Sequence, residues 1–122
     1  MAKSCVEDIV AKADECIATG QYAADLRFGH DYPLMALVSY LGIEGVGERI
    51  PADQICDRWL GFWNIPMGSN LQMIFYRNKA GDVLVKFLYQ EQETRLRGLE
   101  PYDGPYYKWE TVKANLEGYK RN

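Results

Sequence analysis

The sequence contains a single histidine and three cysteines, which is little material for a metal centre. It has no pair of cysteines at zinc-knuckle spacing, so we expect no metal and no cofactor. Cys5, Cys16 and Cys56 are an odd number, a poor basis for a disulfide framework. Cys5 and Cys16 would also lie roughly 16 Å apart along one helix, too far to bridge. We therefore expect small, buried core cysteines.

The chain also lacks an excess of positive charge and any long apolar run. Lys and Arg total 14 against 17 Asp and Glu, for a formal net charge of -3. Nucleic-acid binding draws most of its affinity from Lys and Arg at phosphates, so we expect no nucleic-acid partner. The charge does not exclude a small pocket that binds a single phosphate. The sequence contains no run of about 20 apolar residues, so we expect no membrane span. The first residues lead into an amphipathic stretch and show no signal-peptide core.

What is present supports one compact domain over residues 1–122, with 48% apolar residues. The apolar spacing and the Gly and Pro positions predict a mixed α/β order of elements. The expected elements are a helix over 4–19, a strand over 23–29, a helix over 33–41, a helix opening at 50–53 and carrying Ile55, Trp59 and Leu60, a hairpin of strands 71–77 and 83–89 turning at Gly81, a short extended piece near 94–96, a loop over 99–106 and a helix over 107–119.

The most informative stretch ends in Gly29, His30 and Asp31, between the predicted strand and a helix that Pro33 helps to start. A helix start offers unpaired N–H groups and a partial positive charge, which favour an anion. A protonated His30 would add a donor to that anion, and Asp31 could hold a proton for a leaving oxygen. The pattern suits phosphate ester cleavage. The alternative is structural: His30 would be a turn residue or a helix cap, or Asp31 would be the N-cap of the helix.

Residues 26–31 resemble the second conserved catalytic block of the histidine acid phosphatases, in which a His-Asp pair follows a strand and precedes a helix. The likeness is closest to bacterial members of the branch that includes the multiple inositol polyphosphate phosphatases. Nearly the whole chain is similar to that group, through residues 13–15, 34–37, 65–72, 83–86 and 104–109. The resemblance implies part of a phosphoglycerate mutase-like α/β sheet with flanking helices and a C-terminal β-hairpin.

The resemblance also implies roles for individual residues. His30 would bind the phosphate of a phosphomonoester or inositol phosphate, and Asp31 would protonate the leaving alcohol. Arg27 and Asn70 are further candidates for the substrate site, although a structural ion pair is the favoured role of Arg27. The family is mostly periplasmic or secreted in bacteria.

The sequence departs from the family pattern in two ways. Tyr32 stands where the family often has Thr, and the His-Ala-Glu version found in some inositol polyphosphate phosphatases does not occur. More importantly, the family's nucleophile belongs to an N-terminal Arg-His-Gly-x-Arg-x-Pro block, and His30 is the only histidine. The resemblance thus implies a C-terminal portion that is inactive alone and either lacks an N-terminal half or forms a homo-oligomer. The alternatives are a non-catalytic phosphate- or inositol-phosphate-binding module and a structural or interaction domain.

Overall fold

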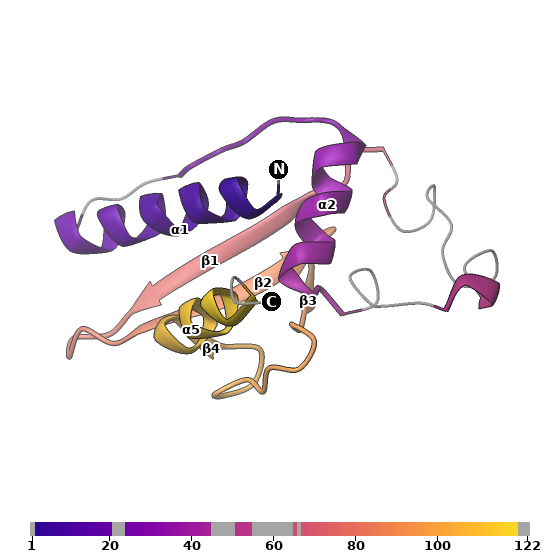
Figure 1. The fold of residues 1–122 in the computed structure, drawn as a ribbon. Helices are drawn as coiled ribbons and strands as arrows, with labels where there is room; N and C mark the ends of the chain where they lie inside the picture. Colours follow the sequence, from indigo (N-terminus) through magenta and orange to yellow (C-terminus); the bar gives the residue numbers. More distant parts are fainter. Residues whose placement is uncertain (1, 21–23, 45–50, 55–64, 66, 120–122) are drawn as a thin grey trace.

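Helices and strands are mixed along the chain, which confirms the predicted α/β class (Figure 1). The structure is a computed structural model that describes residues 2–20, 24–44, 51–54, 65 and 67–119. Its elements are α1 (Ala2–Thr19), α2 (Asp31–Leu41), the 3-10 helix η1 (Ala52–Gln54), β1 (Leu71–Arg77), β2 (Val83–Tyr89), β3 (Gln92–Thr94), β4 (Tyr107–Lys108) and α5 (Trp109–Tyr119). Within these ranges no helix is long and apolar enough to cross a membrane.

The four strands form one antiparallel sheet around β2. β1 pairs with β2 from Leu71↔Tyr89 to Arg77↔Val83, as the sequence predicted. Gly81 has a φ of 92°, a conformation that glycine adopts without steric cost, and it closes the hairpin turn. β3 and β4 pair with different parts of the opposite edge of β2. The extended piece expected near 94–96 corresponds to β3 and to the bridge that Leu96 makes with Ile43.

The helices pack against one side of this sheet and share a core with it (Figure 1). Val85 and Phe87 of β2 are fully buried, and the ring of Phe75 on β1 meets that of Trp109 edge-on at 4.8 Å. Each α-helix adds apolar residues to the same core: Val6 from α1, Val38 and Leu41 from α2, and Trp109, Val112 and Leu116 from α5. The apolar face predicted for the last helix is therefore confirmed.

The glycines predicted to end the first two helices do so. Gly20 has a φ of 69°, and its N–H donates to the carbonyl of Cys16. Gly42 has a φ of 73°, and its N–H is shared by the carbonyls of Val38 and Ser39. The last helix begins at Trp109 and not at Tyr107, because Tyr107 and Lys108 pair with β2 as β4.

The strand predicted over residues 23–29 is wrong for the described residues 24–29. This segment forms no strand, and all of its side chains are exposed. Its alternating pattern suits a strand, but a strand also needs a neighbour for its backbone groups, and no described strand pairs with it.

Two further expectations are corrected or fall outside the described part. Of the helix expected from residue 50, only residues 51–54 are described, and Ala52–Gln54 form a 3-10 turn. Ile55, Trp59, Leu60 and Cys56 lie outside the described residues. Cys5 and Cys16 are free, as expected, but they are half-buried on α1 and not fully buried. Ile9, Ala13 and Ile17 share their helix, and Cys5 and Cys16 lie with them along a cavity.

Candidate functional site

His30 is the N-cap of α2, in extended backbone geometry with φ -108° and ψ 175°. Its carbonyl accepts the first helical hydrogen bond, from the N–H of Leu34 at 3.4 Å. No side chain caps this end of the helix. Because Pro33 has no N–H, Asp31 and Tyr32 carry the backbone donors of the first turn that the helix cannot bond internally. The alternative in which Asp31 is the N-cap is wrong, since His30 holds that position.

Asp31 is the first residue of α2, directly after the histidine. Its side chain lies outside the described part of the structure, so its role as general acid stays a prediction. His30 is exposed, and its imidazole is accessible to a ligand from solvent.

A cavity of about 890 Å³ lies between α1, the 24–30 segment, the start of α2 and β1. His30, Arg27 and Asn70, the candidates that the sequence had named besides Asp31, all line it. Ser69 joins them beside Asn70. Much of the remaining lining is apolar and includes Ile9, Ala13, Ile17, Leu34, Met73 and Phe75. The fold thus gathers the described candidates at one cavity, although they come from distant parts of the chain.

Arg27 forms the ion pair that the sequence favoured. Its guanidinium lies 2.6 Å from a carboxylate oxygen of Asp8 on α1 and donates to Asp25 at 2.8 and 3.1 Å. The hydrogen bonds with Asp25 and then Asp8 raise the pKa of Arg27 above its ordinary value. Two carboxylates therefore balance its charge, and a phosphate would have to compete with both.

Asn70 ends the loop before β1 and is half-buried. Its carbonyl oxygen accepts from the N–H of Gln90, which holds the start of the hairpin closed. Its side-chain oxygen accepts from Nε2 of Gln72 at 3.1 Å. These bonds fix the residue at the wall of the cavity, on the side formed by β1.

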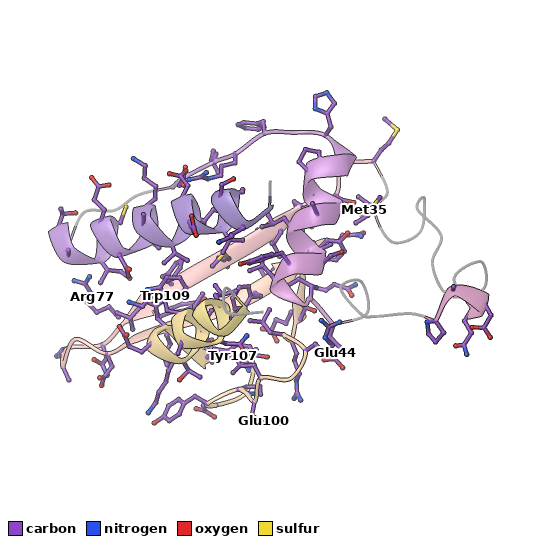
Figure 2. The ribbon with its side chains drawn as sticks, in the orientation of Figure 1. Met35, Glu44, Arg77, Glu100, Tyr107 and Trp109 are labelled. Carbon is purple, nitrogen blue, oxygen red and sulfur yellow. The ribbon has the colours of Figure 1, made fainter. Side chains whose placement is uncertain are left out.

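The far end of the cavity holds a second arginine. Arg77, at the end of β1, lies beside the C-terminal end of α1 (Figure 2), and its guanidinium donates to the carbonyl of Ile17. α1 has 18 residues, so it spans about 27 Å, and His30 and Arg77 stand at opposite ends of the cavity. Neither this arginine nor the cavity could be predicted from the sequence, because both depend on how α1 lies over β1.

No protein-family model and no curated protein matches this chain. The resemblance to the histidine acid phosphatases, with its phosphoglycerate mutase-like fold, therefore stays a prediction that depends on the residues quoted above. Among the described residues, no group of three or more His, Cys, Asp or Glu side chains is placed to hold a metal ion.

Proposed function

We propose that this chain carries the phosphate-binding part of a phosphomonoesterase site and does not turn over substrate alone. His30 is the phosphate ligand, Asp31 is the general acid, and the substrate is a phosphomonoester such as an inositol phosphate. The observation that carries the proposal is the place of His30, at the N-cap of α2, with its side chain exposed beside a cavity.

Three groups at this helix start favour an anion. The backbone N–H groups of Asp31 and Tyr32 have no partner within the helix, and the helix dipole adds a partial positive charge. A protonated His30 would supply a further donor and a full charge. Together they suit one phosphate group, with Asp31 one residue away to protonate the leaving oxygen.

The absence of turnover follows from the missing nucleophile. His30 is the only histidine in the sequence, and it would have to leave the phosphate to attack it. The two arginines that line the cavity are both engaged, Arg27 with Asp8 and Asp25 and Arg77 with Ile17. General acid catalysis alone contributes about 10²–10⁴-fold, far below the roughly 10²¹-fold reached by complete phosphomonoesterase sites.

A phosphatase assay at acid pH tests this proposal. Wild type, His30→Ala and Asp31→Asn would be compared on phytate and on an activated aryl phosphate. We expect no turnover above background from any of the three. Robust turnover by the wild type that is lost in both variants would show that the chain is a complete enzyme, and the proposal would be wrong.

A second candidate is a phosphate- or inositol-phosphate-binding module without catalysis. The balanced charge of Arg27 favours it, because this arginine is not free to stabilise a transferring phosphoryl group. The genomic DNA immediately upstream distinguishes the two candidates. An Arg-His-Gly block encoded there, in frame or frameshifted, would favour the phosphomonoesterase, and its absence would favour the binding module.

A further inference from the structure

Residues 24–30 run as a long open segment alongside α1 (Figure 1), with every side chain exposed. Leu26 is 73% exposed and Phe28 is 91% exposed, which makes them two of the most exposed large apolar side chains of the described chain. No backbone hydrogen bond joins residues 24–29 to another described element. The segment therefore presents both apolar side chains and unpaired backbone groups to solvent, as an uncovered edge strand does.

The segment is nevertheless held in place. Arg27 binds Asp8 of α1 and the neighbouring Asp25, so this part of the backbone is tied down to the helix beneath it. In a ladder successive side chains point to opposite faces, which would place Leu26 and Phe28 on the face opposite Arg27. In the single chain Phe28 lines the cavity together with Arg27. A segment that is already extended loses less conformational freedom when another strand pairs with it.

The sequence of the segment is complementary to itself in an antiparallel arrangement. With Leu26 opposite the Leu26 of a second copy, Asp25 of each copy lies opposite Arg27 of the other. On the other face, the small Ala24 lies opposite the large Phe28. Opposite charges and matched apolar pairs directly across a ladder both stabilise it.

We propose that two copies of this chain associate through residues 24–28, which form an antiparallel ladder about a two-fold axis at Leu26. Such an interface is isologous, with the same patch used by both copies. It covers Leu26 and Phe28 and pairs the backbone groups that the described part of the chain leaves without partners. The second copy supplies the neighbour that the strand-like pattern of residues 23–29 requires.

Charge reversal tests both the interface and its register. The association of the wild type, Asp25→Arg and Arg27→Asp would be measured by sedimentation equilibrium, for each protein alone and for an equimolar mixture of the two variants. We expect the wild type to dimerise with rising concentration. Each variant alone places like charges opposite each other and should dimerise at least tenfold more weakly. The mixture restores opposite charges at both positions and should form heterodimers with an affinity close to that of the wild type.

The mixture also serves as the folding control, because a misfolded variant could not be rescued by the other. Asp8→Asn removes the tether of Arg27 to α1 without changing the charges on the ladder, and it should leave the dimer largely intact. A wild type that stays monomeric at every concentration would overturn the proposal. The segment would then be expected to pair with a strand of a different protein. Dimers that are unaffected by the reversals, or a mixture without recovery, would place the interface elsewhere and would equally overturn it.

Discussion

At the scale of single residues, Tyr107 connects β4 to the loop that precedes it. Its ring is fully buried, and its hydroxyl oxygen accepts a hydrogen bond from the backbone N–H of Leu96 at 3.0 Å. Burial raises the pKa of Tyr107, while the bond from Leu96 opposes that effect in part. The protonated phenol is therefore the form that the fold stabilises.

This shift predicts a loss of stability in alkali. Because the pKa is raised on folding, the contribution of Tyr107 is complete below the ordinary tyrosine pKa of 10.0 and is lost as the pH rises through the folded value. Tyr107→Phe removes the titrating group and leaves the Leu96 N–H unpaired, at a cost of about 1–3 kcal/mol near neutral pH. Denaturant unfolding across this pH range should show a steeper alkaline decline for the wild type than for the variant.

Tyr102→Phe is the matched control, because Tyr102 is 62% exposed and its phenol is not held in the core. We expect that variant to keep the neutral-pH stability and the alkaline decline of the wild type. Parallel pH profiles for the wild type and Tyr107→Phe would show that the buried phenol does not drive the decline.

Asp14 is the residue that ties α1 to α5. One of its oxygens accepts from Nε1 of Trp109 at 2.9 Å and from Nζ of Lys113 at 3.2 Å. Figure 2 marks Trp109 at the start of α5, and its side chain is only 2% exposed. Burial lowers the pKa of Lys113, but its hydrogen bonds with Glu110 and Asp14 outweigh burial, so that the pKa is raised overall.

Asp14→Ala should lower the free energy of unfolding by about 1–3 kcal/mol, because the buried indole N–H of Trp109 loses its partner. Glu15→Ala is the control on the same helix. Glu15 pairs with Lys12 at 3.8 Å on an exposed surface, and such pairs contribute at most about 1 kcal/mol. Chemical denaturation of both variants checks this, and equal losses would contradict the assigned role of Asp14.

At the scale of elements, the β1–β2 hairpin depends on its turn. Asn78 accepts from the backbone N–H of Asp82 at 2.9 Å through its side chain, and Gly81 sits between them with a φ of 92°. A side chain at that φ is strained even though no atom lies within 4 Å of the added Cβ. The backbone conformation, and not the available space, is therefore what requires glycine.

Gly81→Ala should destabilise the chain by about 1–2 kcal/mol, the usual cost of a left-handed conformation for an L-residue. Gly29→Ala is the control, because Gly29 has an ordinary φ and an added Cβ there also meets nothing within 4 Å. That change should be neutral or slightly stabilising, by about 0.4–1 kcal/mol. Thermal unfolding compares the two, and a Gly29→Ala loss as large as that of Gly81→Ala would contradict the argument from φ.

The elements that the sequence predicted well are those whose signals are local. The hairpin has its turn glycine between two runs of β-forming residues, and α2 has Pro33 near its start and Gly42 at its end. The predicted strand was wrong for the described residues 24–29, because pairing depends on a neighbour that no local pattern reveals. β4 was missed for the same reason, since two residues pair with a strand more than 20 positions earlier.

At the scale of the whole molecule, the candidate site combines a local motif with long-range packing. The position of His30 at a helix start could be predicted from Gly29 to Pro33 alone. The cavity beside it could not, because it forms where α1 lies over β1, some 50 residues later in the chain. The ion pair of Arg27 was the favoured prediction, but its partner Asp8 on α1 became apparent only in the fold.

The same packing places the site on the side of the sheet that carries the helices (Figure 1). The opposite side carries an aromatic pair, Tyr76 and Tyr106 at 5.4 Å, with Nζ of Lys86 within 6.0 Å of both rings. Lys86 is also paired with Glu93 at 3.4 Å. The positive charge of Lys86 is therefore already engaged by Glu93 and by the two aromatic rings.

The most direct measurement is a titration of the isotope-labelled chain with inorganic phosphate, followed by the NMR shifts of its backbone amides. We predict that the amides of Asp31 and Tyr32 shift most, because their N–H groups have no partner within the helix and lie at its positive end. His30→Ala should abolish most of the binding, whereas Arg77→Gln, at the other end of the cavity, should preserve it. Shifts that centre on another part of the chain, or equal affinities of wild type and His30→Ala, would contradict the account.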